Sequence, residues 1–161
     1  MVEQLEAIEE VTLTDRRVYP PHVLVFSVFA SITLCFFSDI RIFDSPLPGY
    51  FGALLSIFGI WLVISCRKLF IKFETEITPF KESSTLLQLG PYSYSRNPIY
   101  LGMTLVLLGI CLQLNDPLPF LVPLIFFIWV NICFVLPEEK MMREVYGEQF
   151  VEYTRKVRRW L

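Results

Sequence analysis

Charged and apolar positions are separated into long blocks along the chain. No Asp, Glu, Lys or Arg occurs in residues 18–38, 45–66, 97–115 or 117–137, and these blocks contain 21, 22, 19 and 21 residues. A helix needs about 20 apolar residues to cross a bilayer. A segment that crosses must be helical, because lipid offers no partner for backbone amides. The pattern therefore predicts an all-α integral membrane protein with four transmembrane helices, at about residues 21–38, 50–66, 98–114 and 119–136.

Composition agrees with this pattern. The chain has 161 residues, of which 54% are hydrophobic and 19% charged, and its mean hydropathy is +0.53. A soluble domain of this size could not bury so much apolar surface. A soluble helical bundle is the alternative, but its helices would carry a charged outer face. The first residues are acidic, whereas a secretory signal begins with a basic region, so we expect the first helix to be a true span.

The distribution of basic residues predicts the orientation. In a four-span arrangement, 13 of the 14 Lys and Arg residues lie on one side, in the N-terminal arm, in residues 67–97 and in the tail 137–161. Only Arg41 lies on the other side. By the positive-inside rule, we expect both termini and the long 67–97 loop to face the cytoplasm.

The tail after the fourth span has a different pattern. Apolar residues recur there at steps of three and four, at Met142, Val145, Tyr146, Phe150, Tyr153, Val157 and Trp160. This spacing is typical of an amphipathic helix. We therefore expect one amphipathic cytoplasmic helix over the tail, packed on the 67–97 loop. Within the second span, Gly52, Ser56 and Gly59 are small residues that let helices approach closely.

The polar stretch GPYSYSRNPIYLG, at residues 90–102, lies directly before and within the third span. The turn NDPLP at 115–119 is short, so the third and fourth spans form a hairpin. That hairpin brings Pro98, at the start of the third span, near Glu138, just after the fourth. An arginine, an asparagine, tyrosines and two carboxylates should therefore cluster at one end of the bundle.

Such a cluster could bind a ligand that carries both an amino acid group and a cation. Carboxylates can bind an ammonium or sulfonium group, Arg96 can bind a carboxylate, and tyrosine faces attract cations. S-adenosylmethionine is such a ligand, because it carries an amino acid group and a sulfonium. Each residue also has a plain structural reading: Tyr92, Tyr94 and Tyr100 as membrane anchors, Arg96 as a residue reaching the headgroups, and the carboxylates as partners of a helix dipole.

Metal chemistry has little support in the sequence. Cys35, Cys66, Cys111 and Cys133 lie in or at the edges of spans, without CxxC or metal-ligand spacing, and His22 is the one histidine. We expect buried thiols in the spans and neither a metal nor a nucleic-acid partner.

The order of the motifs along the chain indicates a family. GPYSYSRNPIYLG at 90–102, followed by PEEKMMREVYGEQFVEYTRKVRRWL at 137–161 and preceded by TEITPF at 75–80, resembles the isoprenylcysteine carboxyl methyltransferase and phospholipid methyltransferase superfamily. The resemblance covers about residues 67–161, and the first two spans match only as generic spans. It implies a membrane enzyme that takes S-adenosylmethionine from the cytosol, between the 67–97 loop and the tail, and a lipophilic methyl acceptor from the bilayer.

The resemblance also implies roles for particular residues. The expected cofactor-binding residues are Tyr94, Arg96, Asn97, Pro98 and Tyr100, with Glu138 and Glu139 at the cofactor's amino end. Tyr153 and Arg159 are the candidates for catalytic roles, by covering the cofactor or orienting the acceptor. The eukaryotic prenylcysteine enzymes usually have histidine where this chain has Asn97. The resemblance therefore supports the cofactor more strongly than it supports a prenylcysteine substrate.

The expected function is methyl transfer from S-adenosylmethionine to a lipophilic acceptor at the membrane–cytosol boundary. Carboxyl O-methylation of an isoprenylcysteine-type substrate is favoured, because a carboxylate needs no general base and the sequence offers no clear one. Methylation of a phospholipid amine or of a small thiol remains open. So do a reductase related to the sterol reductases, which are much longer, and a membrane scaffold without enzymatic activity.

Overall fold

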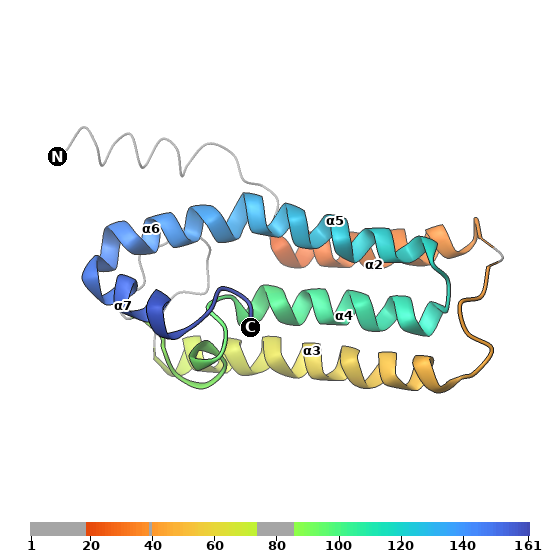
Figure 1. Ribbon diagram of the computed structural model, residues 1–161, viewed down its shortest axis with the longest axis horizontal. Helices are drawn as coiled ribbons and strands as arrows, with labels where there is room; N and C mark the ends of the chain where they lie inside the picture. Colours follow the sequence, from red (N-terminus) through yellow and green to blue (C-terminus); the bar gives the residue numbers. More distant parts are fainter. Residues whose placement is uncertain (1–18, 39, 74–85) are drawn as a thin grey trace.

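Long apolar helices run side by side along the molecule (Figure 1). A computed structural model describes residues 19–38, 40–73 and 86–161, in which all regular structure is helical. The helices that form the long axis are α2 (Pro20–Cys35), α3 (Leu47–Lys72), α4 (Pro98–Leu114) and α5 (Leu121–Val130). Helix α4 is central and packs against α2, α3 and α5. Each of the predicted segments is thus helical, and the third has the predicted bounds.

The last long helix does not end where the sequence predicts. A short 3-10 turn, η2 (Leu118–Phe120), leads into α5, which continues through a π-turn, η3 (Asn131–Val135), into α6 (Leu136–Tyr146). The prediction that this helix ends at Pro137 is therefore wrong. Proline lacks the N–H that an α-turn would use, but a π-turn already changes the hydrogen-bonding pattern just before it.

The tail is not one helix either. Helix α6 ends at Gly147, whose φ of 50° lies in the region that favours glycine, and α7 (Glu148–Lys156) starts in a new direction. The predicted apolar stripe is consequently divided. Phe150, Tyr153 and Val157 of the α7 region form a small buried cluster with Met142 and Tyr146 of α6.

The long loop is shorter than predicted. Residues Arg67–Lys72 are the last turns of α3, so the helix extends beyond the expected boundary at residue 66. Residues 74–85, which include TEITPF, lie outside the described residues, as do residues 1–18 of the N-terminal arm. The described part of the loop resumes at residue 86.

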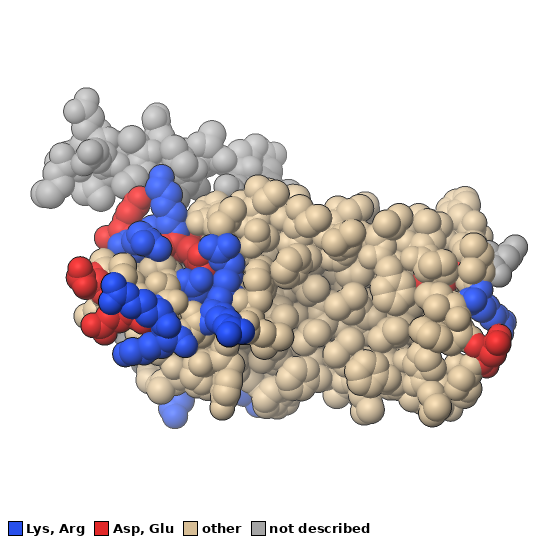
Figure 2. Space-filling view, in the orientation of Figure 1, with Lys and Arg blue, Asp and Glu red and all other residues tan. Residues whose placement is uncertain are grey.

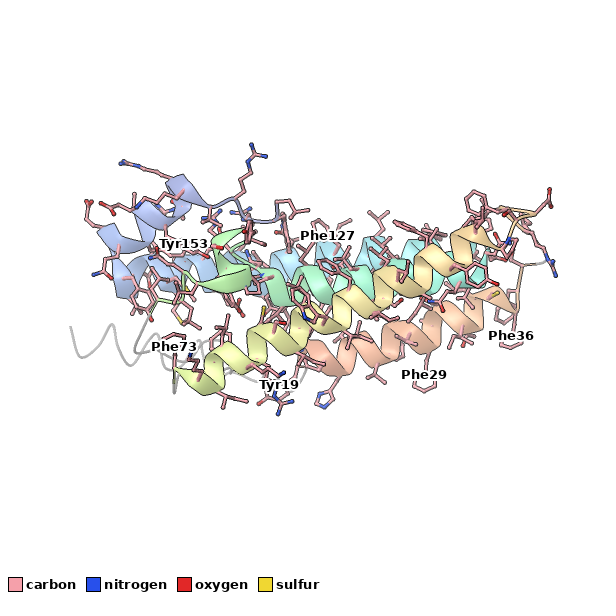
Figure 3. The ribbon with its side chains drawn as sticks, turned by 90° about the horizontal axis from the view of Figure 1, so that it is seen from below. Tyr19, Phe29, Phe36, Phe73, Phe127 and Tyr153 are labelled. Atoms are coloured by element: carbon pink, nitrogen blue, oxygen red, sulfur yellow. The ribbon has the colours of Figure 1, made fainter. Side chains whose placement is uncertain are left out.

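The uncharged surface forms a belt between two charged ends (Figure 2). Among the described residues, two helices are long and apolar enough to cross a membrane by themselves, Leu47–Lys72 and Leu118–Tyr146. The apolar helices Pro20–Cys35 and Pro98–Leu114 are shorter. Large apolar side chains project from the belt; Phe29 of α2 and Phe36, directly after α2, are 65% and 85% exposed (Figure 3). This is the surface expected of a chain with lipid around its middle.

Small residues bring α3 and α4 into backbone contact. A Cβ atom added at Gly59 would lie 2.5 Å from the carbonyl oxygen of Gly102, and one added at Gly52 would lie 2.5 Å from that of Gly109. The hydroxyl of Ser56 donates a hydrogen bond to the backbone oxygen of Val106. The predicted role of Gly52, Ser56 and Gly59 in close helix packing is confirmed.

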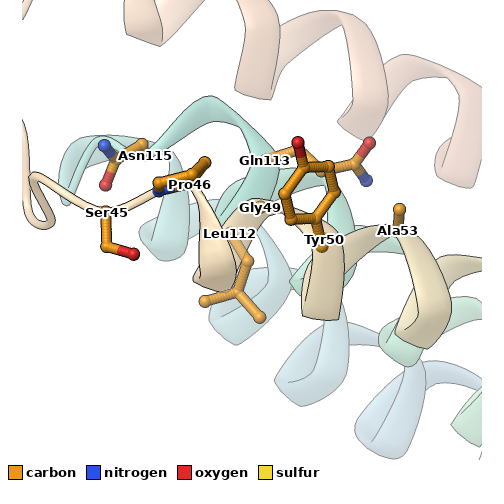
Figure 4. A pocket seen from close by; sticks show the side chains of 8 residues that line it. All are labelled: Ser45, Pro46, Gly49, Tyr50, Ala53, Leu112, Gln113 and Asn115. Carbon is orange, nitrogen blue, oxygen red and sulfur yellow. The ribbon is translucent and has the colours of Figure 1, made fainter.

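The end of the bundle opposite the charged α6–α7 region is fastened by Asn115. Its backbone is left-handed (φ 56°), and its side chain exchanges two hydrogen bonds with the backbone of Phe43. An open pocket of about 390 Å³ lies beside it, between the start of α3 and the end of α4, with Tyr50 and Gln113 in its lining (Figure 4). None of the predicted site residues lines this pocket.

Candidate functional site

The motif at 90–102 folds as a tight turn followed by a helix start. Gly90 has a φ of 60°, and residues Gly90–Ser93 form the 3-10 turn η1. The Ser93 hydroxyl donates to the Gly90 carbonyl at 2.6 Å. Asn97 then precedes α4, which has Pro98 in its first turn. Glycine and proline are therefore used here for the backbone conformations that each favours.

The C-terminal segment after α7 lies directly on this motif. The backbone N–H of Arg96 donates to the Arg158 carbonyl at 3.0 Å. The Ser95 hydroxyl and the Asn97 side-chain amide both donate to the Arg159 carbonyl, at 3.3 and 3.2 Å. Ser95 and Asn97 are only 2% and 7% exposed. The tail is thus fixed to the start of α4 by three hydrogen bonds.

An ion cluster forms where the motif, α6 and the tail meet. Glu139 accepts hydrogen bonds from Arg159 Nε at 3.1 Å and from Arg159 Nη2 at 2.7 Å, in a two-pronged arrangement. On its other side, Arg96 Nη2 lies 3.2 Å from Glu139 Oε1. The Arg96 and Glu139 side chains are only 12% and 14% exposed. The hydrogen bonds to Glu139 raise the pKa of Arg159, so this arginine stays charged.

Arg96 has one further donor. Its Nε is buried and has no hydrogen-bond partner among the described residues. A buried N–H without a partner is costly, and it marks a position where a ligand oxygen would be favourable.

The second carboxylate has a different partner. The Tyr100 hydroxyl, on the first turns of α4, donates to Glu138 Oε1 at 2.6 Å. Tyr100 is 8% exposed and its ring packs against Phe134. The hairpin argument is confirmed, because the start of α4 and the start of α6 meet through both carboxylates.

Tyr153 connects α7 to η1. Its hydroxyl donates to the Tyr92 carbonyl at 2.6 Å, and it is 3% exposed. Burial raises the pKa of Tyr153, and the nearby Glu139 adds to the shift, although Arg96 opposes it. Burial likewise raises the pKa of Tyr92. Both phenols are therefore neutral near pH 7, and Tyr153 is a hydrogen-bond donor rather than a tyrosinate base.

The structure brings most of the predicted site residues together. One set of contacts joins Arg96, Glu139, Arg159 and Asn97, and a second joins Tyr100 to Glu138 on the same helix as Glu139. Tyr153 bonds to the Tyr92 carbonyl of the motif, and Pro98 is buried in the first turn of α4. Tyr94 differs, since it is 77% exposed on the surface. Its role at the cofactor stays a prediction.

Three further residues of this region were not among the predicted site residues. Ser95 and Tyr92 supply contacts to the tail, and their position inside the quoted motif was the available signal. The third is Asn131 in η3, whose side-chain oxygen Oδ1 is buried without a partner among the described residues. Its signal was a lone amide within an apolar span, since polar side chains in spans usually have a function.

A family model described as Phospholipid methyltransferase matches residues 48–149 of this chain. Over 128 residues the chain is 34% identical to the protein-S-isoprenylcysteine O-methyltransferase of Saccharomyces cerevisiae, a match that covers 75% of this chain and 53% of the yeast protein. An uncharacterized protein of Haemophilus influenzae is 35% identical over 63 residues, which are 39% of this chain and 100% of that one.

The fold is also found among solved structures. A eukaryotic intramembrane Ras methyltransferase, isoprenylcysteine carboxyl methyltransferase, matches with a TM-score of 0.67 at 19% identity, over 90% of this chain and 52% of that one. The chain spans about half the length of this protein and of the yeast relative. Its membrane-length helices and its fold are those of an integral membrane protein. With the family model matching well over half of its length, this chain belongs to the phospholipid methyltransferase family.

Proposed function

We propose that this chain transfers a methyl group from S-adenosylmethionine to the carboxylate of an S-isoprenylcysteine-type acceptor at the membrane–cytosol boundary. The observation that carries the proposal is the Arg96–Glu139–Arg159 ion cluster, placed at the end of an apolar helical bundle. A water-soluble cofactor and an oily acceptor can meet only at such a boundary. The name of the yeast relative, a protein-S-isoprenylcysteine O-methyltransferase, supports this choice of acceptor.

The residues present fit the cofactor. Glu138 and Glu139 would bind its ammonium group. Arg96, whose buried Nε has no partner in the described part of the chain, would bind its carboxylate. Tyr94, Asn97, Pro98 and Tyr100 would complete the cofactor site, with Tyr94 closing it from the surface. When bound, the cofactor supplies the methyl: its S–CH₃ bond breaks with the electron pair left on sulfur, while an acceptor carboxylate oxygen forms the new O–CH₃ bond.

The chain's own residues act mainly by positioning. A carboxylate acceptor is already ionised, so no residue has to remove a proton from it. Tyr153, neutral and bonded to the Tyr92 carbonyl, fixes α7 over the motif. Arg159, which is charged and partly exposed, would orient the acceptor carboxylate while its backbone carbonyl stays bound to Asn97. Fixed geometry and exclusion of water supply the rate enhancement in such a site.

The proposed topology has one membrane domain over residues 1–161. In it, α2, α3, α4 and the Leu118–Tyr146 helix are four transmembrane spans, and α7 lies on the cytoplasmic surface with both termini on the same side. The concentration of charged side chains around α6 and α7 supports this orientation (Figure 2). Surrounding membrane lipid would deliver the acceptor from the bilayer.

Methylation of a phospholipid amine is the second candidate, and the description of the family model favours it. An amine must lose a proton before or during transfer. Glu138, whose Oε1 accepts the Tyr100 hydroxyl, is the carboxylate that could receive that proton.

Binding of the cofactor is the first test, and both candidate functions require it. The full chain in detergent should bind S-adenosylmethionine in a calorimeter, and Glu139→Gln should weaken binding about tenfold or more, as expected for loss of a charge-assisted contact. The matched control is Glu144→Gln, an exposed glutamate on the same helix. No binding by folded wild-type protein would refute the proposal.

The acceptor is identified by the chemistry of the product. Methyl-labelled cofactor is incubated with N-acetyl-S-farnesylcysteine or with vesicles of phosphatidylethanolamine. Label that is released as methanol by base marks a carboxyl ester, whereas N-methylated lipid retains the label. Transfer to the vesicles alone would replace the first candidate by the second.

A further inference from the structure

Asn131 is a polar residue in an apolar setting. Within residues 117–137 it is the one side chain with an amide, hydroxyl or charge. Its Oδ1 atom is buried and, among the described residues, accepts no hydrogen bond. Polar side chains within a span are costly, and they usually contact a partner or lie on a substrate path. Asn131 therefore needs a donor that this part of the chain does not supply.

The π-turn sets the direction of this side chain. A π-turn contains about one residue more than an α-turn, so positions at four-residue steps remain on one face through η3. Ile128, Ile132 and Leu136 form the outer face and are 49%, 57% and 43% exposed. The residues that precede Ile132 and Leu136 are less exposed: Asn131 is half-buried and Val135 is fully buried. The face that includes Asn131 borders the fully buried residues Phe126 and Val130, and it continues to Phe127 on one side and to Glu139 on the other.

The tail contacts this face at two points. The Trp160 ring lies 4.6 Å from the Phe127 ring, centroid to centroid, and Phe127 lies at the bundle edge (Figure 3). The preceding residue, Arg159, pairs with Glu139 at 2.7 Å. Phe127 and Glu139 are twelve residues apart, or about 18 Å along the helix. Asn131 lies between these two contacts, about 12 Å along the helix from Glu139 on the side of the apolar belt.

We infer that Asn131 Oδ1 accepts a hydrogen bond from the amide N–H of the methyl acceptor. The inference rests on the proposed function and specifies the acceptor more narrowly: an S-prenylated cysteine whose amino group is part of an amide. Such a molecule carries its N–H one carbon away from the carboxylate and its apolar chain a few bonds further. The distance of about 12 Å from Glu139 to Asn131 can be spanned by the 2.7 Å Glu139–Arg159 contact, followed by an Arg159–carboxylate contact, the carboxylate-to-N–H spacing and the N–H contact to Oδ1, each about 3 Å. An acceptor whose carboxylate binds Arg159 on its Asn131 side therefore presents that N–H to Oδ1.

The test uses a pair of acceptors, one with this donor and one in which a methyl group replaces its hydrogen. Methyl transfer by the full chain in detergent is measured with N-acetyl-S-farnesylcysteine and with its analogue methylated on the amide nitrogen. A site built around an N–H discriminates against an analogue without it. We expect the wild-type KM to be about 3–10-fold higher for the N-methylated analogue, the usual effect of one lost hydrogen bond.

The variant Asn131→Leu, similar in volume, removes the acceptor oxygen. It should raise the KM for the N–H acceptor by the same factor, remove the difference between the two acceptors and leave cofactor binding unchanged. Ile132→Leu, on the exposed face of the same helix, is the matched control and should keep the wild-type discrimination. If Asn131→Leu does not fold, the two acceptors on wild-type protein still decide the question.

Equal KM values for the two acceptors on wild-type protein would overturn the inference. So would a variant that raises both values equally, since that indicates a structural role, or one that only separates a dimer into monomers, since that indicates contact with a second copy. These outcomes leave the proposed function standing, because cofactor binding and transfer persist. Loss of cofactor binding in folded wild-type protein would instead refute the proposed function, and the inference with it.

Discussion

Replacing Glu139 by glutamine removes the negative charge shared by two guanidinium groups. Glu139 accepts a two-pronged contact from Arg159 and lies 3.2 Å from Arg96 Nη2. Glutamine has nearly the same shape, so the change isolates the charge from the packing. Two positive groups would then face each other in a site where the Arg96 side chain is only 12% exposed.

The expected cost follows from these contacts. A hydrogen bond to a charged group contributes about 1.5–3 kcal/mol. The Arg159 side chain is 37% exposed, so solvent screens part of its interaction, and we expect about 2 kcal/mol for the whole change. For a chain of this length that corresponds to a decrease in Tm of about 4–8 °C.

The assay is thermal unfolding in detergent without cofactor, followed by circular dichroism. Glu144→Gln, on the exposed face of α6, should change the free energy of unfolding by about 0.5 kcal/mol or less. Combining Glu139→Gln with Arg159→Gln should cost less than the sum of the single changes, by about 1 kcal/mol. If Glu139→Gln melts like wild type, or if the two changes are additive, the ion cluster does not stabilise the fold as argued.

Three further substitutions test separate contacts. Tyr153→Phe removes the hydrogen bond to the Tyr92 carbonyl and should lower the free energy of unfolding by about 1 kcal/mol. Because burial raises the pKa of Tyr153, its contribution is present below about pH 10 and is lost as pH rises further, so the variant should lose less stability than wild type between pH 9 and 11. Gly59→Ala places a Cβ 2.5 Å from the facing backbone oxygen and should cost about 1–3 kcal/mol, whereas Gly49→Ala, which meets nothing within 4 Å, should not destabilise; equal melting temperatures would contradict the close α3–α4 packing. Tyr100→Phe removes the contact to Glu138 and should weaken cofactor binding by about tenfold or less in the calorimeter, and unchanged affinity would separate Glu138 from the cofactor.

Much of the fold could be predicted from the sequence, because the bilayer imposes a simple length rule. Blocks without charge predicted the helices, and Pro98 marked the start of α4. The site was predictable for a topological reason: a short turn after α4 forces its start to lie near the end of the next helix. Arg96 therefore meets Glu139, and Tyr100 meets Glu138, as the hairpin requires.

The pairing inside the site could not be predicted in the same way. Asn97 was expected to contact a ligand, but its amide donates to the Arg159 carbonyl. That contact depends on how the tail folds back after α7. The spacing of apolar residues predicts helices, but it does not predict where a chain folds back. Tyr92 and Tyr94 are two residues apart in an irregular turn, so their spacing did not indicate that the Tyr92 carbonyl would accept the Tyr153 hydroxyl while Tyr94 remained exposed.

Pro137 shows how a local rule can fail and still explain the site. Proline inside an α-helix removes a hydrogen bond and usually ends or kinks the helix. The π-turn just before it changes the bonding pattern, and the helix continues past the expected boundary to Tyr146. Glu138 and Glu139 therefore lie on a continuous helix rather than on a turn. Successive residues of a helix point about 100° apart, which directs Glu138 to Tyr100 on α4 and Glu139 to the arginines of the motif and the tail. A break in the helix at Pro137 would change the directions of both carboxylates relative to α4 and so separate them from these partners.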